Sequence, residues 1–298
     1  MHTGLSTSVA DRARFIAVED GFNIKRPPLE PRAFGAERDR ALDASCASGV
    51  IPCDMSEVLS TPYPATTPLL LAKFVRLRER DEIATRLRAS GEIYYVLRGR
   101  GWTGQVGGET VEWGKGDIFC LAGGVMTSHH ALEDSVLYTV TDEPLLAFSG
   151  VEPASLTDSP LEAVHYPAEH IERELAALCR RDLGPDTPGR ALFLTSRKME
   201  GSRTCTPALT LTLNAVLPGE RQPPHRHNVA ALVLIIRGGP VHSLIGGRQL
   251  PWEEGSVLLT PPNAVHSHEN VGHDAAVALI VQDGALHYHC RTMGFEFA

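Results

Sequence analysis

Short runs of apolar residues, separated by glycine turns, recur along most of the chain. The runs IYYVLR, which begins at Ile93, and LVLIIR, which begins at Leu232, are rich in β-branched and aromatic residues and each ends before a glycine. Each is followed by a second short run, a Gly-Gly pair, and a third run that ends in a Trp-x-x-Gly turn. Gly-Gly between β-rich runs is typical of a hairpin. The pattern therefore predicts an antiparallel meander of short strands, used twice.

The two meanders form an internal repeat. Sliding the chain by 139 residues aligns residues 91–117 with residues 230–256 without a gap. The turn residues then coincide: Gly99 with Gly238, Gly107 and Gly108 with Gly246 and Gly247, and Trp113 with Trp252. A repeat of this length predicts two copies of one fold unit.

Helical periodicity is sparse and predicts helices only over residues 9–19 and 168–181. The alternating segment LHYHC, with His287 and His289, predicts a strand in which both histidines are structural. Proline and glycine breaks set the expected boundaries: an irregular arm over 1–67, a first barrel over 68–150, a linker with a helix over 151–189, and a second barrel over 190–298. We expect the arm to wrap a barrel or a partner subunit.

Composition narrows the class of protein. The 298 residues are 43% hydrophobic and 21% charged, which is enough for two hydrophobic cores. The net charge of -8 and the lack of a basic cluster predict no nucleic-acid partner. No apolar run approaches the roughly 20 residues that a bilayer requires, and no secretory leader is seen, so we expect no membrane partner and a cytoplasmic location. Six widely spaced cysteines without a CxxC pair predict reduced thiols.

Histidines concentrate near the C-terminus, where 8 of the 13 lie from residue 225 onward. In His225-Arg-His227, positions i and i+2 of a strand face the same side, so both imidazoles point to one place. His266, 39 residues further on, follows a Pro-Pro turn and can approach from another strand. Three imidazole nitrogens that meet at one point predict a metal site.

The pattern resembles the cupin superfamily. Gly219, His225, His227 and Gly238 match its first motif, with Ala231 in the place of the motif's glutamate, and Gly255, Pro261, His266 and Asn270 match its second, with Asn263 replacing a glycine. The resemblance implies an all-β protein: two tandem jelly-roll barrels with a few peripheral helices. Because Ala231 cannot ligate, an octahedral ion would keep three positions open. Fe(II) is the expected cofactor, while nickel, manganese, copper and zinc remain open alternatives.

One branch of the superfamily fits best. The segment LPGE (217–220), the ligand pair His-Arg-His and the later TPPNAVHSHEN resemble the metal-binding cupin of gentisate 1,2-dioxygenases and of their salicylate- and hydroxynaphthoate-cleaving relatives. This implies an Fe(II) dioxygenase that takes a small-molecule substrate and O2, with His225, His227 and His266 as ligands and His268 as a catalytic residue near the substrate. The competing hypothesis is a non-redox isomerase, lyase or decarboxylase, or a bicupin that only binds a small molecule.

Departures from that branch indicate an altered substrate. The family's glutamine before LPGE is Asn214 here, its substrate-side arginine is Val233, and the metal barrel is the second instead of the first. Losing the arginine removes a carboxylate clamp, so gentisate itself is not the expected substrate. We expect Asn214, Val233 and His242 to contact the substrate, and an apolar wall to favour a small aromatic or enolisable compound; the wall comprises Leu211, Leu213, Val233, Ile235 and Leu258.

The first repeat lacks the ligands. The positions of His225, His227 and His266 are taken by Arg86, Arg88 and Thr127, although Glu92 and His129 are retained. We therefore expect a metal-free structural or dimerising barrel and a homo-oligomer, either a dimer or a tetramer.

Overall fold

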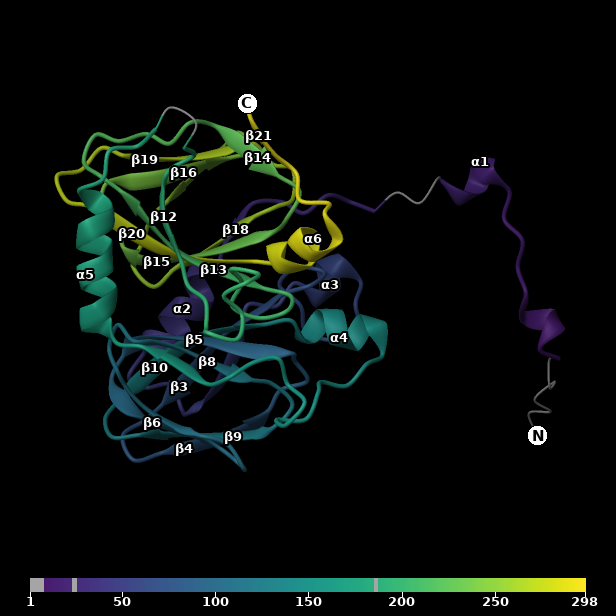
Figure 1. Cartoon of the computed structure of the whole chain (residues 1–298), viewed down its shortest axis with the longest axis horizontal. Helices are drawn as coiled ribbons and strands as arrows, with labels where there is room; N and C mark the ends of the chain where they lie inside the picture. Colours follow the sequence, from purple (N-terminus) through teal and green to yellow (C-terminus); the bar gives the residue numbers. More distant parts are fainter. Residues whose placement is uncertain (1–7, 23–25, 185–186) are drawn as a thin grey trace.

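The chain folds into two β-barrels, each made of two facing sheets. The computed structural model describes residues 8–22, 26–184 and 187–298, and within them the predicted all-β architecture of two jelly-roll units is confirmed. The first barrel lies at the bottom of Figure 1 and the second at the top.

The N-terminal barrel pairs a large sheet with a small one. The large sheet has the order β11-β8-β5-β10-β3-β2 and the small one β4-β9-β6-β7, both antiparallel. The strands are β2 (Gly49–Pro52), β3 (Leu71–Leu77), β4 (Glu82–Arg86), β5 (Gly91–Arg98), β6 (Arg100–Gln105), β7 (Thr110–Gly114), β8 (Ile118–Ala122), β9 (Met126–Ala131), β10 (Ser135–Thr141) and β11 (Val164–Tyr166). Apolar side chains such as Tyr94, Phe119 and Leu137 fill the space between the sheets.

The C-terminal barrel repeats this plan. Its large sheet has the order β1-β18-β15-β20-β13-β12, and its small sheet the order β17-β16-β19-β14-β21. The strands are β1 (Arg32–Ala33), β12 (Arg190–Phe193), β13 (Thr210–Val216), β14 (His225–His227), β15 (Ala231–Arg237), β16 (Val241–Ile245), β17 (Arg248–Pro251), β18 (Val257–Thr260), β19 (His266–Asn270), β20 (Ala276–Gln282) and β21 (Phe295–Phe297).

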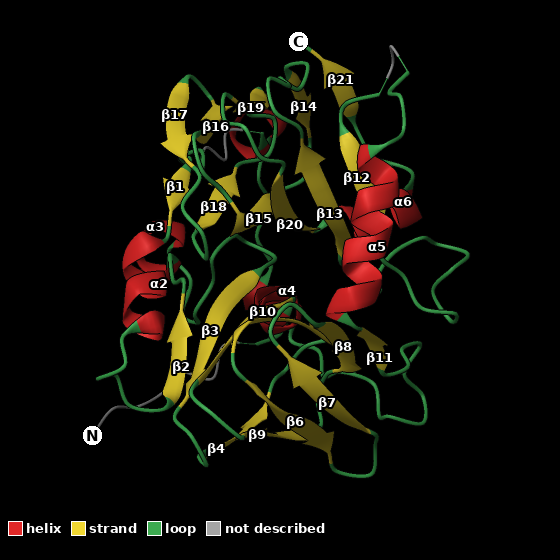
Figure 2. Ribbon diagram, turned by 90° about the vertical axis from the view of Figure 1, so that its left-hand side faces the viewer, coloured by secondary structure: helices red, strands yellow, loops and turns green. Residues whose placement is uncertain are grey.

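Helices lie around the barrels. They are the 3-10 turn η1 (Ala10–Arg12), α1 (Val18–Gly21), α2 (Gly35–Leu42), α3 (Ser56–Leu59), α4 (Glu143–Ser149), α5 (Ala168–Cys179) and α6 (Gly284–Cys290). Within the described residues, none of these helices has the length and apolar character to cross a membrane. The helix expected over 168–181 is α5, which lies along one side of the molecule (Figure 2).

Two local predictions were wrong. The stretch 9–19 holds only η1 and the start of α1, and Phe15 between them is 99% exposed, so no surface packs against its apolar residues. Isolated helices of fewer than roughly 12 residues are marginal without such packing. The LHYHC segment forms α6 instead of a strand, because five residues of alternation are too few to separate the two periods.

The hairpins of the repeat have the predicted turns but not the predicted register throughout. Thr103 pairs with Val111 in the first copy, whereas Ser243 pairs with Leu250 in the second, so Thr103 and Ser243 are equivalent although 140 residues separate them. The second copy has one more residue before β16 and one fewer in its hairpin loop. The two changes cancel, which hides the shift from a gapless alignment.

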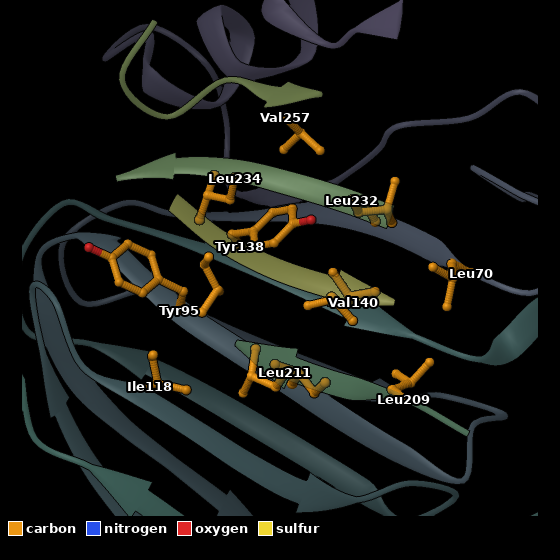
Figure 3. Packing of buried hydrophobic residues seen from close by; sticks show 14 of the residues in the cluster. Leu70, Tyr95, Ile118, Tyr138, Val140, Leu209, Leu211, Leu232, Leu234 and Val257 are labelled. Atoms are coloured by element: carbon orange, nitrogen blue, oxygen red, sulfur yellow. The ribbon is translucent and has the colours of Figure 1, made fainter. Parts of the chain in front are cut away.

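The two large sheets pack against each other and share one apolar core. Figure 3 shows Tyr95, Tyr138 and Val140 of the first barrel facing Leu211 and Leu234 of the second. Each of the two leucines is at most 1% exposed on a strand whose alternate side chains face the interior of its own barrel. This back-to-back contact fixes the second barrel with its small sheet turned outward.

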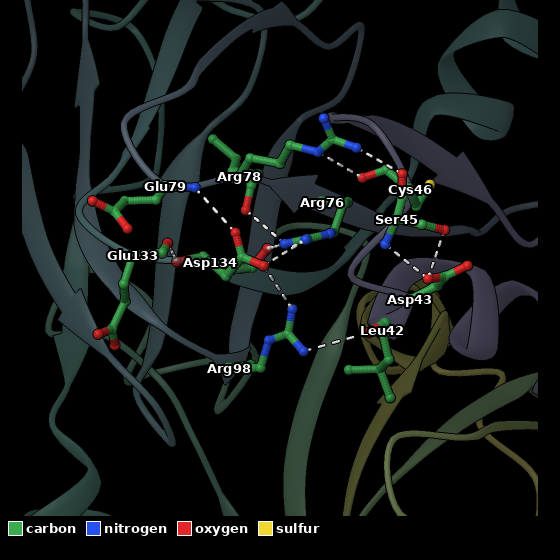
Figure 4. Close-up of polar contacts among 12 residues, drawn as sticks. Leu42, Asp43, Ser45, Cys46, Arg76, Arg78, Glu79, Arg98, Glu133 and Asp134 are labelled. Carbon is green, nitrogen blue, oxygen red and sulfur yellow. Dashed lines mark hydrogen bonds and ion pairs between the residues drawn. The ribbon is translucent and has the colours of Figure 1, made fainter.

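The expected arm is largely built into this structure. Strand β1 pairs with β18 of the second barrel, and β2 pairs with β3 of the first. The fully buried Arg76 donates to Asp134 at 2.8 Å, and Arg98 lies 3.5 Å from the same carboxylate while donating to the carbonyl of Leu42 at 3.4 Å (Figure 4). Arg78 donates to carbonyls of the loop after α2. The contacts of Arg98 and Arg78 fasten the arm to the first barrel.

Candidate metal centre and active-site pocket

The three histidines singled out by the motifs come together in the second barrel. His225 pairs with His266 between β14 and β19, which places all three imidazoles on the inner side of the small sheet. The ring centroid of His266 lies 4.3 Å from that of His225 and 4.7 Å from that of His227. Arg226, between the pair, points outward and forms an ion pair with Glu296 of β21. The expected alternation of this strand is confirmed.

Backbone carbonyls fix the tautomer of each imidazole. The Nδ1 atoms of His225, His227 and His266 each lie 2.9 Å from a carbonyl oxygen two residues away. A carbonyl can only accept, so Nδ1 carries the ring proton in all three rings, and each Nε2 atom keeps a free lone pair. Holding the far ring nitrogen in this way is the usual support for a histidine that ligates a metal.

Burial keeps these rings neutral. Desolvation is the largest cause and lowers the pKa of all three histidines. Neighbouring imidazoles add to this effect at His227 and His266, whose pKa values fall to about 4 and about 2. Neutral imidazole is the form that binds a metal. The donor set therefore fits a divalent ion of the Fe(II) or Zn class.

The rings are not yet arranged as ligands. Among the residues that the structure describes, no group of three or more His, Cys, Asp or Glu side chains has a ready-made metal-binding arrangement. The imidazoles are instead in ring contact, and the Gln282 amide nitrogen lies 3.2 Å from Nε2 of His227. Binding an ion at these nitrogens requires the Gln282 contact to be exchanged.

His268 presents the opposite chemistry. Its Nδ1 atom lies 2.8 Å from Ser243 Oγ, and that oxygen also accepts a hydrogen bond from Trp252 Nε1 at 2.8 Å. Among the described contacts the Ser243 hydroxyl has no acceptor other than Nδ1 of His268, so its proton points there, which leaves the histidine proton on Nε2. Burial lowers the pKa of His268 to about 3, so this ring is a neutral hydrogen-bond donor beside the three acceptor rings.

The imidazoles open onto a pocket of about 200 Å³. Its polar lining comprises Thr212, Asn214, Gln222, Thr260 and Gln282, and its apolar lining includes Ala191, Ala231, Val233 and Ile280. Phe193 and the tail residues Tyr288, Met293 and Phe295 complete the wall. No lysine or arginine is among the described lining residues.

Not every residue expected at this pocket reaches it. Asn214 and Val233 line it, but His242 faces the outer side of β16, 3.5 Å from Glu269. The one-residue shift of the repeat explains this difference, because Ser243 takes the inward position. Of the expected apolar wall only Val233 lines the pocket. The β13 residues Leu211 and Leu213 belong to the core between the barrels. The other two, Ile235 and Leu258, belong to the core within the second barrel.

Several lining residues gave no signal in the sequence. Two of them, Thr260 and Gln282, line the pocket because their strands flank Ala231. Two others, Tyr288 and Phe295, line it because the C-terminal tail folds over the small sheet. A Thr and a Gln at strand ends carry no motif. Only the aromatic spacing of the last four residues could have indicated a packed tail.

The first barrel keeps the support of His268 without the ligands. His129 Nδ1 lies 2.8 Å from Thr103 Oγ1, which accepts from Trp113 Nε1 at 2.8 Å. Thr127, at the position of His266, accepts a hydrogen bond from Gln105 at 3.0 Å. The Trp-hydroxyl-His arrangement is thus common to both barrels, whereas the three-imidazole cluster belongs to the second.

Residues 213–282 match the model of the family described as "Cupin domain". The C-terminal barrel is a cupin domain. The matched range runs from β13 to the end of β20 and contains the three clustered histidines, His268 and Gln282.

Curated relatives are similar to part of this chain. A gentisate 1,2-dioxygenase from Ralstonia sp is 32% identical over 123 residues, which are 41% of this chain and 30% of that protein. A gentisate 1,2 dioxygenase 1 from Aquipseudomonas alcaligenes is 34% identical over 95 residues, or 32% of this chain and 26% of that protein. The matched part of the chain thus spans about a third or less of the length of these relatives.

The fold similarity extends further. A salicylate 1,2-dioxygenase from Pseudoaminobacter salicylatoxidans, solved as adducts with gentisate, superposes with a TM-score of 0.75 at 14% sequence identity and covers 94% of this chain and 88% of its own. The expected resemblance to cupins of the gentisate dioxygenase type is confirmed. The likeness of both barrels is one of fold.

Proposed function

We propose that this protein is a non-haem Fe(II)-dependent dioxygenase that cleaves a C-C bond of a small chelating aromatic or enolisable substrate with O2. The observation that carries the proposal is the cluster of three neutral imidazoles whose Nε2 atoms carry no proton, with Ala231 where a carboxylate ligand would stand. Three protein ligands leave room on the ion for both reactants. The dioxygenase names of the sequence relatives support the oxidative chemistry.

His225, His227 and His266 would hold the ion, and Fe(II) would supply Lewis acidity and O2 chemistry there. We prefer iron to nickel, manganese, copper or zinc because three-ligand facial sites with open positions are typical of Fe(II) oxygenases. The neutral ligands leave the ion's full positive charge to attract an anionic or enolic oxygen.

The other side chains bind and orient the substrate. His268 donates from Nε2, so it hydrogen-bonds an oxygen atom of the substrate that gains negative charge during the reaction. Asn214 and Gln222 also line the pocket and supply further uncharged contacts. The small sheet, the tail and Phe193 enclose the pocket, which limits access of water.

The lining supports a substrate without a separate carboxylate clamp. Val233 is 1% exposed at the position where the gentisate-type motif has arginine, and the described lining holds no lysine or arginine. Burying a second carboxylate there would leave it unpaired at a large free-energy cost. The preferred substrate is therefore a compound whose chelating oxygens are its main polar part, and gentisate should react slowly.

Oxygen uptake tests this function. The Fe(II)-loaded protein is mixed with hydroxylated aromatic acids, catechol-type compounds and β-diketones, and O2 consumption and product mass are recorded. We expect uptake with at least one compound and a product two oxygen atoms heavier. Bound iron without uptake for any compound would contradict the dioxygenase and favour a non-redox cupin enzyme or a binding protein. Rapid ring opening of gentisate would overturn the substrate assignment alone.

We also propose that the chain forms a homo-oligomer, a dimer or a tetramer, through the first part of its N-terminal arm, residues 8–22. Residues 8–22 extend away from the barrels in Figure 1, and Phe15, Ile16 and Phe22 are 99%, 70% and 89% exposed. Apolar side chains displayed this way are covered when a second copy binds. Light scattering should give a multiple of 32.3 kDa for the full chain and a smaller multiple after Phe15→Ser with Ile16→Ser. An unchanged mass for the double variant would exclude this role for the arm.

A further inference from the structure

The side of the pocket at Ala231 carries two hydrogen-bonding groups that the function above leaves unused. We propose that Thr260 and Gln282 form a subsite that holds one oxygen atom of a ligand directly over Ala231. The proposal rests on the proposed Fe(II) function, since the ligand would also contact the ion.

The β-ladder places these three residues side by side. Ala231 pairs with Thr260 of β18 on one side and with Gln282 of β20 on the other. Directly paired residues of neighbouring strands point to the same face, and all three residues line the pocket with His227. The methyl group of Ala231 thus forms the floor between two longer polar side chains.

The Thr260 hydroxyl has no hydrogen-bond partner in the described structure. The residue is fully buried, and Oγ1 is among the few buried polar atoms without one. Such groups are rare in folded proteins because they lose their water contacts without compensation. A valine would occupy the same volume without that loss, so the hydroxyl is explained by a ligand that it binds.

Gln282 becomes a donor to the same place when the ion binds. Its amide nitrogen now donates to Nε2 of His227 at 3.2 Å, because Nδ1 of that histidine carries the proton donated to the Val229 carbonyl. An ion bound at Nε2 takes this lone pair, and the Gln282 amide must then find another acceptor. Across the sheet from Gln282, its paired neighbour Ala231 offers no acceptor side chain, and Thr260 follows on the far side of Ala231.

Two uncharged donors select a particular ligand atom. They favour an oxygen atom that accepts hydrogen bonds, whether neutral or anionic, but they cannot form an ion pair with a carboxylate. The subsite therefore takes an oxygen atom of O2 or of a hydroxyl or enol group of the substrate. Nitric oxide, which binds Fe(II) with an acceptor oxygen outward, serves as a probe without turnover.

Nitric oxide titration of the Fe(II) protein, followed by electron paramagnetic resonance, tests the subsite. We expect Thr260→Val and Gln282→Leu each to weaken nitric oxide binding about fivefold to tenfold, the range of one lost hydrogen bond. Thr260→Val should keep or raise the melting temperature, since it removes a buried hydroxyl without a partner. Thr127→Val makes the same change in the first barrel and should leave nitric oxide binding unchanged.

The outcomes separate the two proposals. Wild-type affinity in both Thr260→Val and Gln282→Leu, with iron content unchanged, would overturn the subsite while leaving the dioxygenase intact. A lower melting temperature for Thr260→Val with unchanged affinity would also overturn it, because the hydroxyl would then be structural. Failure of the wild-type Fe(II) protein to bind nitric oxide would instead contradict the open iron site, and the subsite with it.

Discussion

At the residue scale, the site depends on which ring nitrogen each histidine offers. His266 and His268 are two residues apart on β19, yet the first has Nδ1 against the Ala264 carbonyl and the second has Nδ1 against the Ser243 hydroxyl. The carbonyl accepts and the hydroxyl donates, so the two rings expose a lone pair and an N–H respectively. In the proposed function these neighbouring imidazoles would have different roles, His266 at the ion and His268 at the substrate.

Replacing His268 should impair the reaction without removing the metal. His268→Gln is expected to lower kcat by about 100-fold, the lower end of the range for a group that assists at a reacting oxygen, while iron content stays at the wild-type level. Ser243→Ala should cause a smaller loss of the same kind, because Ser243 only positions the ring. Loss of iron from His268→Gln would identify this histidine as a ligand and refute its role as a hydrogen-bond donor to the substrate.

Glu92 should make the stability of the protein fall as the pH rises. It is fully buried, and desolvation, the largest cause, raises its pKa from 4.5 to about 8. The folded state therefore holds this proton between pH 4.5 and 8 while the unfolded state releases it, so its stabilising contribution is complete below pH 4.5 and is lost as the pH rises toward 8.

Denaturant unfolding of Glu92→Gln across that pH range checks this. The amide keeps the shape and can accept the hydrogen bond from Tyr94, but it does not titrate. Its stability relative to wild type should rise from pH 5 to pH 8 by several kcal/mol, since each pKa unit corresponds to about 1.4 kcal/mol. A constant difference across the range would show that Glu92 titrates normally.

At the scale of elements, the C-terminal strand β21 supports the centre. It pairs with β14 residue by residue, so that His227 lies opposite Phe295 and His225 opposite Phe297. The Phe295 ring is 5.2 Å from that of His225 and forms part of the pocket wall. The tail therefore lies against the two proposed ligands of β14 and forms part of the pocket wall.

Removing the tail strand should weaken both metal binding and substrate binding. Removal of residues 295–298 is expected to weaken Co(II) binding, measured from its visible absorption, and to raise KM about tenfold, comparable to losing the burial of one aromatic side chain. Phe297→Ala, which leaves the strand and the pocket lining in place, is the matched control and should change KM little. Equal KM values for the truncated and full chains would show that the tail has no part in binding.

Much of the arrangement of strands, hairpins and clustered histidines could be predicted from the sequence, and the exceptions have physical causes. The His-x-His spacing and the Gly-Gly turns depend only on local strand geometry, so they predicted the clustered histidines and the hairpins. The prediction that His242 points into the pocket was wrong because of an insertion and a compensating deletion in the second repeat. Together they leave the ends of the alignment unchanged but exchange the inward and outward positions of β16. Thr260 and Gln282 were missed because only strand pairing brings them to Ala231.

At the scale of the whole molecule, the two barrels share an apolar core, so we expect them to fold as one unit. Leu234 is fully buried in that core on the outer face of β15, although its strand also carries Ala231 of the site. The composition indicated two cores, but it gave no sign that a third would lie between the barrels. Strands such as β15 and β20 carry apolar side chains on both faces, so the face of each large sheet that points away from its own barrel also needs burial.

Unfolding of the second barrel should therefore carry the first with it. Leu234→Ala is expected to cost about 2–5 kcal/mol of stability and to preserve a single transition. Trp102 and Trp113 lie in the first barrel and Trp252 in the second, so replacing Trp252 with Phe, or both of the others with Phe, separates the fluorescence of the two barrels. Two transitions at different urea concentrations would contradict a common core.

The metal content of the purified chain is the most direct test of the central claim, that His225, His227 and His266 hold one catalytic ion. After anaerobic loading with Fe(II) and removal of excess ion, elemental analysis should give about one iron per chain. The variant with His225→Ala and His266→Ala should give none, while its unfolding transition shows that it still folds. No bound ion in the wild type, or equal content in wild type and variant, would contradict the account.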